Sequence, residues 1–328
     1  MCLSRLYHHI SQAWPPRPKF TDKDIPPLDG KVYVISGANT GIGKILAQIL
    51  YSKNARVIIT ARSQEKGDKT IEDIKREVPV SKGELIFVRM DLADLNQVKT
   101  AAHEILQRED RINVLFNNAG VMVLKGEPKT VQGYEEQLGV NNVGTHLFTQ
   151  LLAPTLVRAA QNEPAGSVRV IWVSSSGSEM QSPPGGVPMH NLDYHEKADP
   201  FVRYAISKAG VYYQGAEFAR RYKGAGIVSV PLHPGILNTD LFRQANGIQR
   251  RLFTFLFSYP PIYGAYTEIF AAFAPEVAAR SGEWVVPWGR YMDVRKDMKE
   301  ATKSKEEGGT GIASAFWDWN EEQIRPYM

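Results

Sequence analysis

The chain has very little cysteine, because Cys2 is the only one among its 328 residues. An intrachain disulfide and a zinc cluster built on thiolates are therefore excluded. The same scarcity favours a reducing compartment, so we expect a cytoplasmic protein. Long tracts of one charge are also missing, since 39 Lys and Arg are interleaved with 35 Asp and Glu for a net charge of +4. This balance gives no indication of nucleic-acid binding.

Long uninterrupted apolar runs are missing too. Residues 1–30 are rich in proline and lack the ~7–15 apolar residues of a secretory signal, so they predict an irregular N-terminal arm. Residues 252–273 contain no Lys or Arg, but Pro260, Pro261 and Glu268 interrupt them before the ~20 residues of a bilayer helix are reached. No transmembrane helix is expected. A lid over a site, buried core, a subunit contact and a membrane-surface patch remain alternatives for this segment.

What the chain does have is an alternation of short apolar segments and longer helical ones. Hydrophobic residues make up 43% and charged residues 23%, which are globular values. Strands are expected at residues 31–36, 56–60, 84–90, 112–116, 168–173, 227–232 and 283–286, and helices at 42–52, 64–77, 95–108, 134–160 and 203–222. This pattern predicts an α/β fold, a single-domain doubly wound parallel sheet of about seven strands with helices on both faces. The expected domain spans 31–290, with a C-terminal tail at 291–328.

A glycine-rich loop follows the first expected strand. Gly37, Gly41 and Gly43 stand where the strand passes into a helix. The first glycine permits a tight turn, the second lets a pyrophosphate approach the backbone, and the third allows close packing of helix on strand. A turn without a ligand is the alternative. A nucleotide-hydrolase phosphate loop is excluded, because Ile45 stands where that motif needs Ser or Thr after Gly-Lys.

The end of the second strand bears on the choice of dinucleotide. Sites for NAD usually carry an acidic residue there, which holds the ribose 2′-hydroxyl. This chain has Arg62 and no acidic residue at that place. A guanidinium can pair with a 2′-phosphate, so the sequence favours NADP(H). A solvated Arg62 with no ligand is the alternative.

Tyr204 and Lys208 lie four residues apart in an expected helix, which places a phenol and an ammonium on one face. A nearby cation favours phenolate, so we expect Lys208 to lower the pKa of Tyr204 and to make it a general acid or base. Polar segments also end three other strands, at 117–120, 173–176 and 233–239. The carboxyl edge of an open α/β sheet is where ligands bind, so these loops are expected to converge on one site.

Together these motifs make the chain resemble the short-chain dehydrogenase/reductases, over roughly residues 31–239 and with a Rossmann-type fold. Within that family, the segments around Asn141, Ser175 and His233 resemble the retinol dehydrogenase-like, NADP-preferring branch, and Trp317–Asn320 resembles fungal members. The resemblance implies that Tyr204 exchanges a proton with the substrate oxygen. It also implies that Ser175 hydrogen-bonds that oxygen, that Lys208 binds the nicotinamide ribose, and that Asn141 anchors a proton-relaying water.

The resemblance further implies a set of cofactor-binding residues. They are Gly37, Asn39, Thr40, Gly41, Ile42, Gly43, Arg62, Asp91, Leu92, Asn117, Ala119, Gly120, Tyr204, Lys208, Pro234, Gly235, Ile236 and Thr239. Ser174 and Ser176 remain alternatives to Ser175, and Asn142 remains an alternative to Asn141. The separation of Ser175 from Tyr204 is longer than in compact members, and the excess around residues 183–186 is expected to loop over the pocket.

The substrate is the least determined feature. Aromatic and aliphatic residues at 241–273 are expected to form a lid, which favours a lipophilic small molecule such as a retinoid, steroid, polyketide or terpenoid-like ketone, aldehyde or secondary alcohol, and a role in secondary metabolism. The predicted function is an NADP(H)-dependent oxidoreductase. The alternative is a non-catalytic dinucleotide-binding regulator or scaffold. No metal is expected, because no histidine spacing resembles a zinc site. Family members assemble as homodimers or homotetramers, between which the sequence does not decide.

Overall fold

One mixed sheet forms the centre of the molecule. The computed structural model describes residues 10–238 and 258–328. The strands are β1 (Val32–Ser36), β2 (Arg56–Ala61), β3 (Glu84–Arg89), β4 (Val114–Asn117), β5 (Arg169–Val173), β6 (Val228–Leu232), β7 (Val285–Val286) and β8 (Arg290–Tyr291). They are arranged in the order β3-β2-β1-β4-β5-β6-β7-β8. The expected parallel α/β sheet is confirmed, with eight strands rather than about seven.

The additional strand is β8 at the sheet edge. All neighbouring strands from β3 to β7 are parallel, whereas β8 runs antiparallel to β7, with Val286 opposite Arg290. A pairing of two residues is too short to give an apolar run that the sequence would reveal. The central strands β1, β4, β5 and β6 are buried throughout, which explains their nearly continuous apolar sequence.

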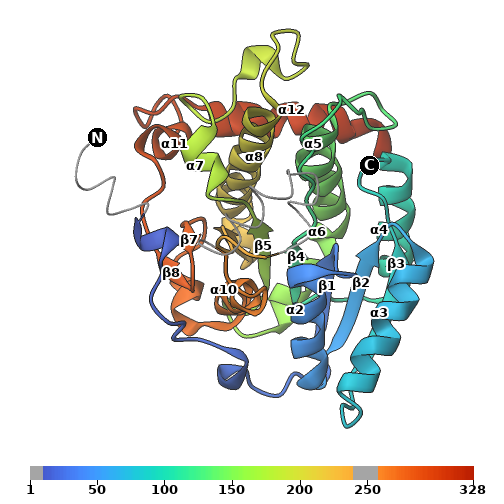
Figure 1. Ribbon diagram of the computed structural model, residues 1–328. Helices are drawn as coiled ribbons and strands as arrows, with labels where there is room; N and C mark the ends of the chain where they lie inside the picture. The colour runs from blue at the N-terminus through green and yellow to red at the C-terminus, as the bar shows by residue number, and fades with distance from the viewer. Residues whose placement is uncertain (1–9, 239–257) are drawn as a thin grey trace.

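Helices cover both faces of the sheet (Figure 1). On one face lie α2 (Gly41–Ser52), α3 (Gln64–Glu77) and α10 (Ile262–Phe273). On the other lie α4 (Leu95–Arg108), α6 (Thr145–Asn162), α8 (Pro200–Arg221) and α12 (Ile312–Ile324). Each face has its own apolar core, with Ile35 and Ile171 pointing to the first face and Val34 and Trp172 to the second. This alternation is the two-residue period of a strand buried on both sides.

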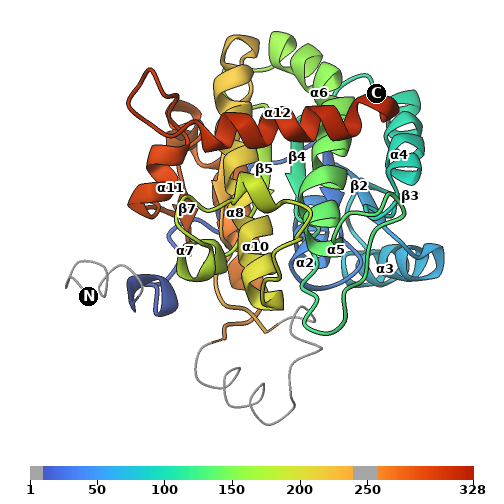
Figure 2. The same ribbon diagram turned by 90° about the horizontal axis from the view of Figure 1, so that it is seen from above.

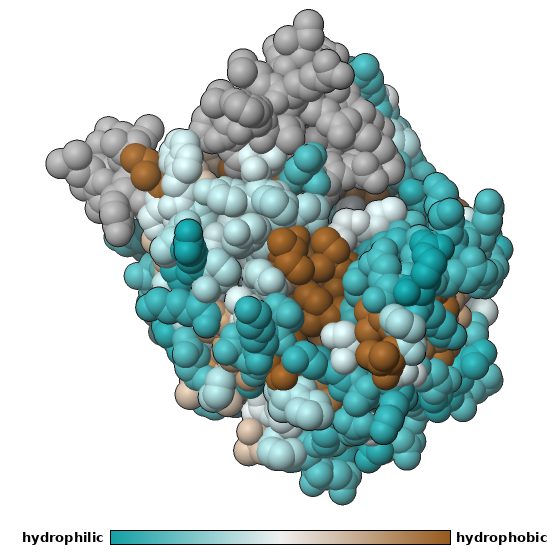
Figure 3. Space-filling view, turned by 60° about the horizontal axis from the view of Figure 1, so that its bottom comes forward, coloured by the Kyte–Doolittle hydropathy of each residue, from teal (hydrophilic) through white to brown (hydrophobic). Residues whose placement is uncertain are grey.

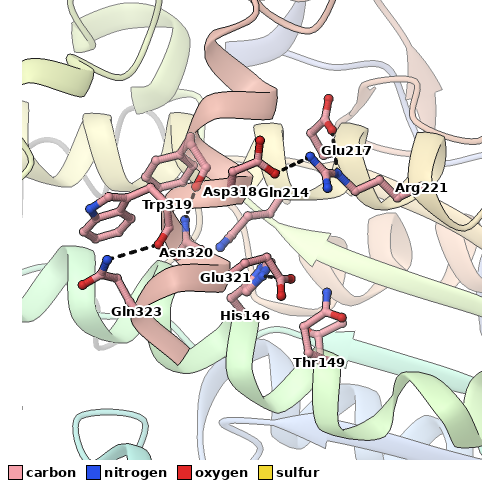
Figure 4. Close-up of polar contacts among 12 residues, drawn as sticks. His146, Thr149, Gln214, Glu217, Arg221, Asp318, Trp319, Asn320, Glu321 and Gln323 are labelled. Atoms are coloured by element: carbon pink, nitrogen blue, oxygen red, sulfur yellow. Dashed lines mark hydrogen bonds and ion pairs between the residues drawn. The ribbon is translucent and has the colours of Figure 1, made fainter. Parts of the chain in front are cut away.

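The C-terminal residues, expected as a tail, fold onto the body of the protein. They include α11 (Lys296–Ala301) and α12, which runs across α8 and α6 (Figure 2). Phe316 is fully buried, and a side-chain Cβ at Gly210 of α8 would lie 2.7 Å from its ring. Polar contacts surround this packing, including Arg221 with Asp318 at 2.7 Å and His146 with Glu321 at 2.8 Å (Figure 4).

The N-terminal arm is likewise attached. Residues 10–13 are helical and lie beside β8 (Figure 1). A short 3-10 turn, η1 (Asp22–Asp24), is capped by Thr21, and Ile25 and Leu28 behind it are buried in the core. The described part of the arm thus has two short helical turns, and it is attached to the body of the protein beside β8 and through Ile25 and Leu28.

The segment 252–273 divides into two parts. Residues 239–257, which include most of the expected lid, lie outside the described residues. α10 packs against α2 and the sheet, with Ala265 and Ile269 fully buried, so this part is core. Within the described ranges, no helix is long and apolar enough to cross a membrane. The face shown in Figure 3 is largely hydrophilic, with hydrophobic side chains gathered in a central patch.

Candidate active site

A cleft of about 1290 Å³ lies at the carboxyl ends of the central strands. It is bordered by the loops after β1 and β4, the two strands at which the strand order reverses. Such a reversal is where dinucleotides and other ligands bind in doubly wound sheets. Of the residues expected from sequence, those lining the cleft are Gly37, Asn39, Thr40, Gly41, Ile42, Gly43, Arg62, Asp91, Leu92, Ala119, Gly120, Ser175, Tyr204, Lys208, Pro234, Gly235 and Ile236.

The glycine loop has the geometry of a phosphate cradle. Gly37 and Gly41 have φ values of +68° and +57°, a region that side chains disfavour. A Cβ at Gly43 would lie 2.6 Å from the carbonyl oxygen of Gly37, so this close approach requires glycine. The N-cap Thr40 makes no side-chain capping hydrogen bond, which leaves the first amides of α2 directed at the cleft. These features fit a pyrophosphate at the helix N-terminus.

A cationic group lies beside this loop, at the end of β2. Arg62 is exposed and lines the cleft next to Ser63, the residue that caps α3. Lys66, in the first turn of α3, lines the same region and was missed by the sequence reasoning. Its position four residues after Arg62 was the available signal, because that spacing places both cations near the start of one helix. The donor set therefore fits a 2′-phosphate on the adenosine ribose.

Tyr204 and Ser175 meet at the middle of the cleft. Ser175 follows β5, and Tyr204 lies in the second turn of α8, whose N-terminus is capped by Asp199. The two side chains lie side by side, because a Cβ at Gly177 would be 3.4 Å from Ser175 Oγ and 3.6 Å from the Tyr204 ring. The backbone N–H of Gly177 donates to Ser175 Oγ at 3.1 Å and fixes that hydroxyl. A phenol and a hydroxyl held together in this way could both contact one substrate oxygen.

The other two serines of this run have different surroundings. Ser174 is buried and donates to the carbonyl oxygen of Lys208 at 2.6 Å, so its hydroxyl supports α8. Ser176 lines the cleft but directly precedes α7 (Gly177–Gln181). The geometry thus favours Ser175 as the partner of Tyr204.

The expected lowering of the Tyr204 pKa by Lys208 does not match the structure. Burial raises the pKa of Tyr204 to about 12, and the neighbouring Ser175 hydroxyl only partly opposes this effect. Lys208 Nζ lies 5.9 Å from the centre of the tyrosine ring and donates to the carbonyl oxygen of Val173 at 2.9 Å. Burial also lowers the pKa of Lys208 to about 8, which weakens it as a neighbouring cation. Tyr204 is thus a neutral phenol at neutral pH, the form that donates a proton.

Asn141 lies behind the cleft rather than on its wall. It belongs to a π-helical stretch, η2 (Gly139–Gly144), between the short α5 (Glu136–Leu138) and α6. Its side chain accepts from the backbone N–H of Val121 at 2.8 Å and donates to Ser207 Oγ at 2.9 Å. Asn142 instead donates to the carbonyl oxygen of Ser207 and contacts Gln214 inside the helix packing. Asn141 therefore links the loop after β4 to the helix that carries Tyr204.

Asn117 is the other expected residue that does not reach the cleft. It is the last residue of β4, and its side chain points into the core, where it donates to Thr149 Oγ1 at 2.8 Å. The next residue, Asn118, lines the cleft and donates to the carbonyl oxygens of Ser36 and Gly37. Strand alternation is the reason, because neighbouring side chains point to opposite sides. Asn118 thus holds the glycine loop against the end of β4.

The segment after β6 forms the next part of the wall. Pro234, Gly235 and Ile236 line the cleft, whereas Thr239 lies outside the described residues. His233 is buried, and the backbone N–H of Gly235 donates to its Nδ1 at 3.3 Å. In the part of the chain that is described, no three His, Cys, Asp or Glu side chains gather in a way that could hold a metal ion.

The insert after Ser175 contributes α7 rather than a covering loop. Met180 and Gln181 of α7 line the cleft, whereas residues 183–186 pack away from it, with Gly185 accepting from the Tyr213 hydroxyl at 2.7 Å. Arg295 fixes the end of α7. Its guanidinium donates to the carbonyl oxygens of residues 179, 182 and 183 at 2.7–3.0 Å. The expectation that 183–186 loop over the pocket is therefore wrong, because these residues are bound to α8 and to the C-terminal segment.

Sequence reasoning also missed a wall formed by the N-terminal arm. Ile10, Ala13 and Trp14 line the cleft, more than 200 residues before the loop after β6 that they lie beside. The only signal in the sequence was an apolar pattern within an otherwise polar, proline-rich segment.

Comparison with known proteins places these features in context. Residues 31–187 match the family model for short chain dehydrogenase. The chain is 46% identical to a short-chain dehydrogenase/reductase of Phomopsis amygdali over 97% of this chain and 96% of that protein. It is 45% identical to short-chain dehydrogenase/reductase bet4 of Neocamarosporium betae over 97% and 93%. The fold resembles the RhlG/NADP active-site complex of Pseudomonas aeruginosa with a TM-score of 0.62 and 23% identity, covering 82% of this chain and 96% of that one.

Proposed function

The chain belongs to the short-chain dehydrogenase/reductase family, and on that premise we propose that it is an NADP(H)-dependent enzyme that reduces a lipophilic ketone or aldehyde, or oxidises the corresponding alcohol. The observation that carries the proposal is the placement of Ser175 and Tyr204 side by side in the same cleft as the phosphate cradle. A regulator that only binds a dinucleotide has no need of that pair.

The cleft fits a nicotinamide dinucleotide from its own residues. Gly37, Gly41 and Gly43 would hold the pyrophosphate, and Arg62 with Lys66 would hold a 2′-phosphate, which supports NADP(H) over NAD(H). A bound nicotinamide would supply or accept the hydride. Among the fold neighbours, the RhlG structure carries NADP and a 3-ketoacyl-(acyl-carrier-protein) reductase of Brucella melitensis carries NADH, so the choice rests on Arg62 and Lys66.

The chain's own residues would control the proton. Tyr204, a neutral phenol at neutral pH, would donate its proton to the substrate oxygen as the carbonyl is reduced. Ser175 would hydrogen-bond the same oxygen and keep it within reach of the phenol. Lys208 would contact the nicotinamide ribose and stabilise the phenolate that remains. Asn141 would keep α8 in register with the loop after β4, and a water bound there would return a proton.

The lining of the cleft supports a lipophilic substrate. Beside Ser175 and Tyr204 it presents Met122, Met180 and Phe201. Sites that bind apolar small molecules combine such walls with few polar groups. We further propose that the enzyme acts in secondary metabolism, within the retinol dehydrogenase-like branch of the family, as a cytoplasmic homodimer or homotetramer.

A Tyr204→Phe variant tests the proposal. We expect at least a ~100-fold loss of NADPH-dependent turnover of a ketone such as 2-acetylnaphthalene, while NADPH still raises the thermal midpoint as in the parent. Tyr212→Phe is the matched control, because Tyr212 lies on the same helix and does not line the cleft. Unchanged turnover in Tyr204→Phe would refute the assigned chemistry. Cofactor binding without turnover in the parent would favour the regulator instead.

A further inference from the structure

The N-terminal arm is held at the cleft by two independent anchors. His233 Nε2 and Gln12 Oε1 are 2.7 Å apart, and both residues are buried. Because Gly235 donates to the other ring nitrogen of His233, that nitrogen is the acceptor, and the neutral imidazole donates from Nε2 to Gln12. The arm is therefore bound directly to the segment that carries Pro234 and Gly235 of the cleft wall.

The second anchor is Arg290 at the start of β8. Its guanidinium donates to the hydroxyl oxygen of Ser11 at 2.9 Å and to the carbonyl oxygen of Ser11 at 2.7 Å. The same group also donates to the carbonyl oxygen of Pro287 at 2.6 Å, which fixes its direction. Two neighbouring residues of the arm, Ser11 and Gln12, are thus bound to two different parts of the sheet edge.

These anchors determine where the apolar side chains of the arm lie. Residues 10–13 are helical, and the backbone N–H of Trp14 donates to the carbonyl oxygen of Ile10 at 2.9 Å. With Gln12 directed inward to His233, Ile10, Ala13 and Trp14 line the cleft. Ile10 and Trp14 remain 44% and 53% exposed, although large apolar side chains are usually buried. Exposed apolar side chains that border a cleft indicate a surface that a ligand covers.

From this arrangement we propose that the arm is the outer wall of the substrate site, and that Trp14 and Ile10 select bulky apolar carbonyl compounds or alcohols over small ones. This inference rests on the proposed function and names the element that sets its specificity. The arm borders the cleft beside the loop after β6 and beside β8, whereas Met180 and Phe201 line the cleft from α7 and α8. A bulky ring system could thus be held between the arm and these two helices.

The test compares two ketones of different size with NADPH and the full chain. For Trp14→Ala we expect kcat/KM for 2-acetylnaphthalene to fall about tenfold, the size of a lost aromatic contact, while kcat/KM for 2-butanone changes less than about twofold. Gln12→Leu, which removes the anchor but leaves the apolar wall residues Ile10, Ala13 and Trp14 unchanged, should produce the same selective loss. Trp14→Phe should retain most of the activity on the larger ketone. Val80→Ala is the control, because Val80 is an exposed apolar residue that does not line the cleft.

An equal fall for both ketones in Trp14→Ala, or no fall for either, would overturn the inference. Its failure can be separated from failure of the proposed function. If the parent turns over no ketone, binding of 2-acetylnaphthalene provides the test instead. The ketone added to the NADPH-loaded parent must raise the thermal midpoint, and the rise must be smaller in Trp14→Ala. No rise in the parent, or an equal rise in the variant, would overturn the role of the arm.

Discussion

The ammonium group of Lys208 donates a hydrogen bond to the carbonyl oxygen of Val173, and the two residues belong to α8 and to the end of β5. Lys208 is thus attached to the strand that leads directly to Ser175. This hydrogen bond holds the ammonium group of Lys208 in a buried position, where burial lowers its pKa.

The charge of Lys208 predicts how activity depends on pH. Burial lowers its pKa to about 8, so the cation is present below that pH and is lost above it. We expect reductive kcat/KM to fall with the loss of one proton as pH rises through about 8. Lys208→Met should reduce kcat/KM at least ~100-fold at pH 7 and abolish this fall. The measurement is kcat/KM between pH 6 and 10, with Lys223→Met in the exposed 3-10 turn after the same helix, η4 (Lys223–Ala225), as control. A fall near pH 8 that persists in Lys208→Met would contradict the assignment.

The buried carboxyl group of Glu268 leads us to expect that the stability of the fold also depends on pH. Glu268 is 0% exposed on α10, and neither of its carboxyl oxygens has a hydrogen-bond partner among the described residues. The charge of Lys208 only partly opposes the effect of this burial on the pKa of Glu268. Burial raises its pKa to about 8. A raised carboxyl pKa contributes stability below the unfolded value near 4.5, and this stability is lost as pH rises toward 8.

Glu268→Gln removes that titration. We expect the variant to gain stability relative to the parent as pH rises from 5 to 8, by more than about 1 kcal/mol at pH 8. Urea unfolding at several pH values measures the difference, with the exposed Glu276→Gln as control. A difference that does not change with pH would show that Glu268 is not held in its neutral form.

Arg62 predicts the choice of cofactor. Arg62→Ser should weaken NADPH binding about tenfold or more, because a charged hydrogen-bond partner of the 2′-phosphate is lost, and should leave NADH binding unchanged. Thermal midpoints at equal concentrations of the two cofactors measure this. Arg76→Ser makes the same change of charge at the exposed far end of α3. An equal effect on NADPH and NADH would remove Arg62 from cofactor selection.

Packing of Phe316 against α8 leads us to expect that the C-terminal helix α12 contributes strongly to stability. The Phe316 side chain is fully buried against α8 and stacks on Trp319 with 5.9 Å between ring centres. Phe316→Ala should lower the free energy of unfolding by ~3–5 kcal/mol, since it leaves a cavity in a packed core. Urea denaturation measures the loss, and Val131→Ala at an exposed position should change little. A loss below about 1 kcal/mol would mean that α12 is only loosely attached.

The sequence was most informative where local rules decide the structure. The positions and parallel pairing of the strands, the glycine loop with Gly37 and Gly43, and the spacing of Tyr204 and Lys208 follow from periodicity and steric limits. The side of the strand to which Asn117 points and the weakness of the Lys208 effect on Tyr204 depend on burial, which the spacing does not reveal.

Contacts between segments far apart in the sequence could not be predicted from the sequence either. The bond between Gln12 and His233 joins residues 221 positions apart, and no local pattern records such a pairing. The same holds for β8, whose two residues pair only because Arg290 is brought beside Val286 by the turn before it.

Arg295 has a consequence for the order in which the protein is assembled. A ribosome makes the glycine loop, Ser175 and Tyr204 long before it makes residue 295, because domains emerge N-terminal part first. Until then the end of α7 lacks the guanidinium that holds residues 179–183. The nascent chain thus contains the glycine loop, Ser175 and Tyr204 at a stage when residues 179–183 are not yet held by Arg295. Residues 179–183 therefore reach their final arrangement only after residue 295 has been synthesised and has bound to them.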